Sequence, residues 1–253
     1  MRRILFPLLI AILTLTIFPA CAQEPVTFAD DLIGEYIYPE GSTPENALYI
    51  YRYRYPQLAG EGQLVEMFNT NYQYTAEDAL GFEAPMLATE MLPGDPQKVV
   101  DISYEITCMN DDWLSLRICK SVTVMGIETR VYSGHVFALT GSGMGRITNL
   151  PTFLGMLDPE ETDEWLLNRQ TKKADRVVRE MVWNVLQERS GEAFTLYDDL
   201  TFEEFEASFY PEEDFFLAEN GDLTFFLPAG VCAPEEDGEI LITFTFDEID
   251  DEM

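Results

Sequence analysis

The sequence predicts an α+β fold, in which a mostly antiparallel sheet packs against one long helix and shorter helices. Three observations lead to this prediction. Residues 100–124 alternate between apolar and polar side chains on both sides of a short turn, residues 158–189 carry apolar side chains at helical spacing, and residues 240–246 alternate again. Strands, helices and strands thus follow one another along the chain, an order that is typical of α+β domains.

The first 22 residues have the layout of a secretory signal sequence. Arg2 and Arg3 precede an apolar run from Ile4 to Phe18, which is followed by small residues at Ala20, Cys21 and Ala22. The run is shorter than the about 20 apolar residues that a membrane span needs. Two processing routes are open, cleavage after residue 22 or lipidation of Cys21 after a leader that ends at residue 20. Both predict an extracytoplasmic protein, secreted or attached to the cell envelope, with membrane contact only through the leader or a lipid anchor.

Composition predicts a folded chain after this leader. Of all residues, 47% are hydrophobic and 13% aromatic, which is enough to build a core in one domain or two closely packed ones. We expect a short linker over residues 23–47 and a module over residues 48–250, with an N-terminal half at 48–125 and a C-terminal half at 126–250.

The charge is strongly negative and unevenly distributed. The full chain has a net charge of −31, and without the leader 13 basic residues stand against 46 acidic ones. Residues 190–253 contain 20 acidic residues and no Lys or Arg. Such a balance excludes nucleic acid as a partner and favours a cationic protein or divalent cations. A surface that only keeps the protein soluble is the alternative.

Residues 49–55 form the most regular candidate strand. Strict alternation places Tyr49, Tyr51, Tyr53 and Tyr55 on one face. Exposed tyrosines in this arrangement could bind a cell-wall glycan or a protein, so these four are candidate ligand-binding residues. Tyrosine is also a common strand residue that packs beneath helices.

The next strands form a hairpin with its turn at residues 110–112. A three-residue turn pairs positions whose numbers sum to 222 and places both apolar sets on the same face. In this register Cys108 points to the core and Cys119 points away, so we predict no disulfide between them. A further strand is expected over residues 130–139, before a glycine-rich turn.

Helix signals are found in three places. Residues 64–72 indicate a short helix, followed by a loop that contains Pro85. Asp158 is the expected N-cap of the long helix, and Thr201 with Glu204 predicts a capping box for a third one. The expected buried stripe of the long helix consists of Leu167, Ala174, Val178, Met181, Val182 and Val185.

The residue pattern predicts no catalytic centre. His135 is the single histidine, and Ser133 two positions before it forms neither a nucleophile elbow nor a triad. One histidine does not make a zinc site either, so we expect no metal and no other cofactor. The alternatives are an enzyme that acts on envelope polymer through a carboxylate pair and a structural accessory protein.

Several short segments resemble, in order and spacing, an extracytoplasmic domain of the cell envelope. They begin with Tyr53-Arg54-Tyr55-Pro56-Gln57-Leu58 and continue as Phe68-Asn69-Thr70-Asn71-Tyr72, Ser103-Tyr104-Glu105-Ile106, Leu114-Ser115-Leu116, Tyr132-Ser133-Gly134-His135, Thr140-Gly141, Ile147-Thr148-Asn149-Leu150 and Phe215-Phe216-Leu217-Ala218-Glu219-Asn220-Gly221-Asp222-Leu223. Together they span residues 48–246. The chain is thereby similar to the module shared by the anti-sigma factor RsiV and PdaC-type peptidoglycan deacetylases, the domains of unknown function 3298 and 4163.

This resemblance implies a non-enzymatic binding or sensing module. In the anti-sigma factor the module binds lysozyme, so the resemblance implies a cationic protein as ligand, or else a peptidoglycan fragment. It also makes His135 a candidate ligand-binding residue, although the family has Gly-Gly-Ala-His where this chain has Ser133-Gly134-His135. A tyrosine-rich stretch of the family is replaced by residues 228–232.

Overall fold

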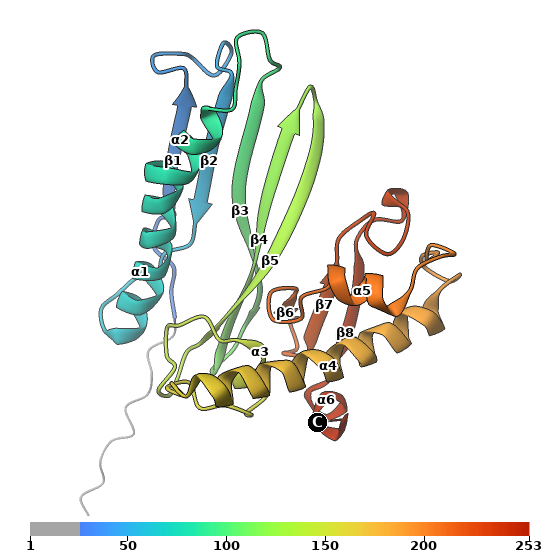
Figure 1. The fold of residues 1–253 in the computed structure, drawn as a ribbon. Helices are drawn as coiled ribbons and strands as arrows, with labels where there is room; N and C mark the ends of the chain where they lie inside the picture. Colours follow the sequence, from blue (N-terminus) through green and yellow to red (C-terminus); the bar gives the residue numbers. More distant parts are fainter. Residues whose placement is uncertain (1–25, 253) are drawn as a thin grey trace, which may run out of the picture.

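The structure is a computed structural model that describes residues 26–252, so the predicted leader and Cys21 lie outside the described residues. The larger sheet holds five strands in the order β1-β2-β3-β4-β5. These strands are β1 (Leu32–Tyr38), β2 (Tyr49–Tyr55), β3 (Lys98–Met109), β4 (Trp113–Val124) and β5 (Ile127–Ala138). All neighbours are antiparallel except β2 and β3, which are parallel. The α+β fold with a mostly antiparallel sheet is confirmed (Figure 1).

A helical segment covers one face of this sheet (Figure 1). It comprises α1 (Gln63–Asp78), the π-helical turn η1 (Ala79–Glu83) and α2 (Ala84–Ala88), and it supplies the crossover that a parallel strand pair requires. The predicted helix at 64–72 is confirmed and is longer than expected. The expected loop at Pro85 is wrong, because Pro85 lies in the first turn of α2, where a missing N–H is tolerated.

The expected linker over residues 23–47 contains the edge strand β1. This strand pairs with β2 from Leu32 opposite Tyr55 to Tyr38 opposite Tyr49. An ion pair of 2.6 Å between Glu35 and Arg52 adds to the pairing. The strand is only partly buried, so its sequence lacks the clean alternation that would have predicted it.

The hairpin of β3 and β4 follows the predicted register until a β-bulge shifts it. Pairs from Lys98–Val124 to Ile106–Leu116 sum to 222, whereas beyond the bulge Cys108 pairs with Ser115. The strands are therefore joined by a two-residue turn instead of the three-residue turn expected. Cys108 is buried in a core as predicted, but the bulge directs its side chain into the core of the C-terminal half and away from the face that carries Val100 and Ile102.

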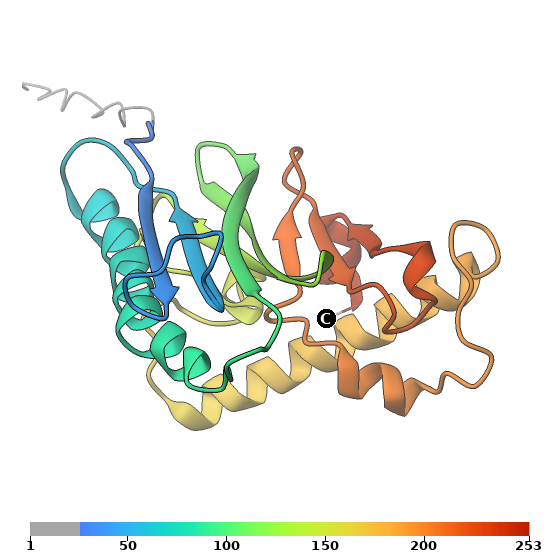
Figure 2. The ribbon, with the colours of Figure 1, turned by 90° about the horizontal axis from the view of Figure 1, so that it is seen from above.

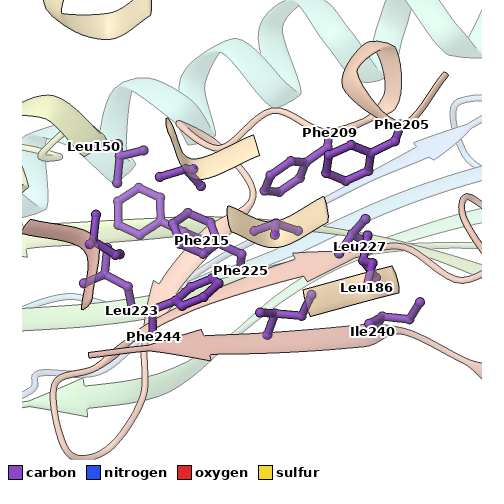
Figure 3. Packing of buried hydrophobic residues seen from close by; sticks show 14 of the residues in the cluster. Leu150, Leu186, Phe205, Phe209, Phe215, Leu223, Phe225, Leu227, Ile240 and Phe244 are labelled. Carbon is purple, nitrogen blue, oxygen red and sulfur yellow. The ribbon is translucent and has the colours of Figure 1, made fainter. Parts of the chain in front are cut away.

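The C-terminal half builds a second, smaller sheet of three antiparallel strands, in the order β6-β7-β8. Its elements are α3 (Leu150–Phe153), α4 (Glu164–Arg189), α5 (Phe202–Ser208), β6 (Phe215–Leu217), β7 (Leu223–Leu227), the 3-10 turn η2 (Glu235–Asp237), β8 (Ile240–Phe244) and α6 (Phe246–Glu252). Seen from above, the long helix α4 runs along one side of the molecule, from the larger sheet to the smaller one (Figure 2). Phenylalanines from α5 and from all three strands of the smaller sheet fill the core that these elements build with α4 (Figure 3).

The long helix begins at Glu164, five residues after the predicted start, because its N-cap is Asp163 and not Asp158. Asp163 is its N-cap and accepts hydrogen bonds from the backbone N–H groups of Trp165 and Leu166, while Asp158 caps a separate turn by accepting from Glu160 N. Both aspartates satisfy the N-cap rule, and the sequence does not rank them. Of the predicted stripe, Ala174, Val178 and Val182 are fully buried, and Leu167, Met181 and Val185 are half-buried. The predicted capping box of α5 is confirmed.

Two hydrogen bonds, among other contacts, join the larger sheet to β6 and to the segment just before it. The Gly134 N–H on β5 donates to Glu213 O at 3.0 Å. Ser115 on β4 is buried and its Oγ accepts from Leu217 N at 2.9 Å. The Gly134 contact lies at the β5 edge and the Ser115 contact on the face away from α1, so β6 covers one part of that face.

Candidate functional site

The four tyrosines of β2 lie in the core between the larger sheet and α1. Their exposed fractions are 0% for Tyr49 and Tyr51, 6% for Tyr53 and 3% for Tyr55. Tyr55 stacks on Tyr72 of α1, with ring centroids 5.1 Å apart. These side chains pack beneath the helix as tyrosines in strands commonly do, and they present no open aromatic surface in this structure.

Burial also keeps these phenols protonated. The pKa of Tyr55 rises to about 12, mainly because the charged form would lose its hydration. The Tyr51 hydroxyl donates to Glu83 Oε2 at 2.8 Å, and Lys120 of β4 forms an ion pair with the same carboxylate. The network therefore ties β2 and β4 to the helical segment through Glu83.

His135 belongs to the same layer of the molecule. Its Nδ1 lies 3.1 Å from the Tyr72 hydroxyl, and the two rings are stacked with centroids 6.0 Å apart. Burial lowers the pKa of His135 to about 4, so the imidazole is neutral at physiological pH. The structure thus brings His135 close to the tyrosines through Tyr72, in a packed environment.

The open face of the larger sheet carries a cluster that the sequence did not reveal. The guanidinium carbon of Arg117 lies 3.7 Å from the ring centroid of Tyr132 and between 5 and 6 Å from those of Phe216 and Phe226. Arg117 also forms an ion pair with Glu239, which precedes β8. This arginine therefore connects both sheets by cation–π and ionic contacts.

Beside Arg117 the same face is hollowed into an open pocket of about 310 Å³. Small, aromatic and charged side chains line the pocket together: Ser103, Tyr104, Glu105, Arg117, Cys119, Ser121, Glu128, Arg130 and Tyr132. Hairpin alternation predicted from sequence alone that Cys119 points away from the core, whereas Arg117 was not predicted as part of a site. The partner Glu239 is 122 positions away, so no local pattern could indicate it.

The C-terminal segment exposes most of its acidic side chains. Among residues 190–252 all 20 acidic side chains are exposed except Asp214, Asp222 and Glu239, which are half-buried. They belong to α5, η2, α6 and the loops between them. A surface of one sign attracts partners of the opposite sign from several ångströms away.

Two half-buried carboxyl groups, one in α4 and one in the C-terminal segment, have raised pKa values. Asp175 of α4 faces Glu212, and burial together with that neighbour raises its pKa to about 6. Burial likewise raises the pKa of Asp214 to about 6, although its Oδ2 accepts from Tyr210 N at 2.7 Å. These groups lie where α4 packs on the segment before β6.

The three described cysteines carry free thiols. Cys108 and Cys232 are buried, and Cys119 is half-buried in the wall of the pocket. Burial raises the pKa of all three thiols, which leaves them protonated. Within residues 26–252 no three His, Cys, Asp or Glu side chains are grouped as metal ligands, and no helix there is long and apolar enough to span a bilayer.

Comparison with known proteins gives structural neighbours only. No family model and no curated protein matches the sequence. One similar solved structure is a member of the DUF3298 family from Bacteroides fragilis, with 14% identity, a TM-score of 0.47 and coverage of 88% of this chain and 92% of that one. Another is a DUF3298 family protein from Pseudomonas aeruginosa, with 11% identity, a TM-score of 0.47 and coverage of 89% and 93%.

Proposed function

We propose that this chain is a non-enzymatic, extracytoplasmic binding or sensing module whose ligand is a cationic protein such as lysozyme. The observation that carries the proposal is the surface of residues 190–252, which exposes 17 carboxylates and offers no basic side chain. A strongly basic protein would be steered to this surface and held there by many weak ion pairs. The family resemblance in the sequence points to the same class of ligand.

A protein ligand fits the geometry better than a glycan does. The case for a glycan depended on exposed tyrosine rings, and those of Tyr49, Tyr51, Tyr53 and Tyr55 are covered by α1. The acidic surface, by contrast, is accessible over several elements. Its breadth suits a folded partner, because an ordinary protein interface takes about 800 Å² from each side.

The test is titration calorimetry of the chain from residue 23 onward with hen lysozyme. We expect binding at an ionic strength of about 0.02 M that weakens steeply towards about 0.3 M, because exposed charges are screened beyond a few ångströms at high salt. Absence of binding at low salt would refute the proposal for lysozyme.

Paired substitutions locate the contact. Glu235→Gln with Glu236→Gln neutralises η2, and Asp250→Asn with Asp251→Asn neutralises α6. If either element is in the interface, its double variant weakens binding by about two- to thirtyfold, the value of two exposed ion pairs.

A matched control lies on the other half of the molecule. Glu77→Gln with Asp78→Asn removes two exposed charges at the end of α1 and should leave the affinity within about twofold. An equal loss in this control and in both C-terminal variants would mean that only net charge matters, which contradicts a specific acidic surface.

A further inference from the structure

The strand β5 forms one edge of the larger sheet, and its first half is uncovered. The hairpin of β4 and β5 rises above the C-terminal elements in Figure 1. Residues 127–131 are all exposed, and the apolar side chains of Ile127 and Val131 are exposed by 72% and 61%. Natural proteins rarely leave a long edge strand with exposed apolar residues unprotected, since it can pair with another strand.

The backbone of β5 shows which groups point outward. In its second half the Gly134 N–H donates to Glu213 O, Val136 O accepts from Thr148 N and Ala138 O accepts from Gly145 N. Alternate residues of an antiparallel strand direct both backbone groups to the same side, so the even-numbered residues of β5 point away from β4.

In the first half these outward groups have no partner. The backbone N–H and C=O groups of Glu128, Arg130 and Tyr132 make no hydrogen bond beyond the sheet within the described part of the chain. The outward backbone groups of these three residues can therefore form hydrogen bonds with another strand. They lie just before Gly134, whose N–H already donates to Glu213 O.

The side chains on this edge are complementary to themselves. If a second β5 lies antiparallel with Thr129 opposite its own copy, Glu128 faces Arg130 of the other strand and Ile127 faces Val131. The backbone N–H and C=O groups of Glu128 and Arg130 point away from β4. These two residues can therefore form the hydrogen-bonded pairs of the new antiparallel ladder. Shifting the register by two would place arginine opposite arginine or glutamate opposite glutamate, which is unfavourable.

We propose that two copies of this chain associate through their β5 edges, antiparallel and centred on Thr129, to join two five-stranded sheets into one. The contact is isologous, so each pair of unlike residues occurs twice across the twofold axis. It contains two Glu128–Arg130 pairs, two Ile127–Val131 pairs and two symmetry-related sets of backbone hydrogen bonds. The ion pair of 2.9 Å that already joins Glu128 and Arg130 within one strand becomes part of a four-charge cluster.

Salt dependence separates this association from the proposed binding of a cationic protein. Each copy carries a net charge of −31 or lower, so the copies repel each other at low ionic strength. Salt screens this long-range repulsion more than it weakens the backbone hydrogen bonds at the edge. Self-association should therefore increase with salt, opposite to lysozyme binding, and either can fail without the other.

Charge exchange tests the register by sedimentation equilibrium of the chain from residue 23 onward. Arg130→Glu alone and Glu128→Arg alone should each weaken the dimer by about tenfold or more, because like charges then face each other in both pairs. A mixture of the two variants should form a heterodimer, since every cross-strand pair is again of opposite charge.

Cysteine cross-linking tests the symmetry axis. In the proposed register Thr129 lies in a non-hydrogen-bonded pair with its own copy, with Cα atoms about 4.5 Å apart, which suits a disulfide. Thr129→Cys should give a cross-linked dimer on mild oxidation. Val131→Cys should not, because the two copies of residue 131 lie about 13 Å apart.

The outcomes are decisive in both directions. A dimer that increases with salt, heterodimer formation by the mixed charge variants and cross-linking at residue 129 alone support the proposal. A monomer at all salt concentrations, or a dimer unaffected by Arg130→Glu, overturns it.

Discussion

Replacing Gly134 with alanine tests the contact between the two sheets. A Cβ atom at this position would lie 1.5 Å from Phe215 O and 2.5 Å from Phe215 C. Ordinary contact begins at 3.4 Å, so β6 must retreat by about 2 Å, which also lengthens the hydrogen bond from Gly134 N to Glu213 O. Overpacking of this kind and one weakened hydrogen bond together cost about 3 kcal/mol.

Urea and thermal unfolding followed by circular dichroism measure this loss. A free energy of about 3 kcal/mol corresponds to a fall of roughly 10 °C in the unfolding midpoint for a chain of this size. Gly81→Ala is the matched control, because nothing lies within 4 Å of its added methyl group, and it should be neutral or stabilise by up to about 1 kcal/mol. If Gly134→Ala stays within about 0.5 kcal/mol of the unchanged protein, then β6 does not cross β5 as described.

Three further substitutions check separate parts of the fold. Ser115→Ala leaves the Leu217 N–H without its acceptor inside the protein and should cost about 2 kcal/mol in urea unfolding; an unchanged midpoint would mean that this bond is absent. Thr201→Ala removes the capping box of α5 and should lower the free energy of unfolding by about 1 kcal/mol, with no effect expected only if the helix is not formed. Asp175 has a folded-state pKa of about 6, above its ordinary value of 3.8, so the folded protein binds this proton more tightly and loses stability as the pH rises from about 4 to 6. Asp175→Asn should therefore stabilise the folded protein by about 1 kcal/mol near pH 8, after allowance for solvent screening. The same substitution should not stabilise it near pH 4. Equal effects at both pH values would contradict the raised pKa.

Local patterns predicted the parts of this fold that depend on neighbours in the sequence. The alternation around residues 100–124 gave the register of β3 and β4, and the Thr201–Glu204 spacing gave the capping box. The bulge beyond Ile106 was not predictable, because it lets Cys108 fill a core that is built mostly from residues 150–249. The sequence also could not predict that Asp163 and not Asp158 is the N-cap of α4, because both residues fit the N-cap preference.

The candidate site was less accessible from sequence than the fold. Alternation placed Tyr49 to Tyr55 on one face, but whether that face meets solvent or a helix depends on where α1 packs. Arg117 was not identified, since its aromatic neighbours come from three other strands and Glu239 comes from a loop. The acidic surface, by contrast, follows from composition alone because charged side chains are almost always exposed.

The two sheets do not form separable halves. Cys108 of β3 and Val136 of β5 are buried in the core that α4 and β6 to β8 build, so strands of the larger sheet complete the smaller one. A fragment that ended before Leu150 would expose that side of its own strands, and a fragment that began there would lack one wall of its core. The chain should thus unfold in a single cooperative transition, and a proteolytic cut between the sheets should release no stable piece.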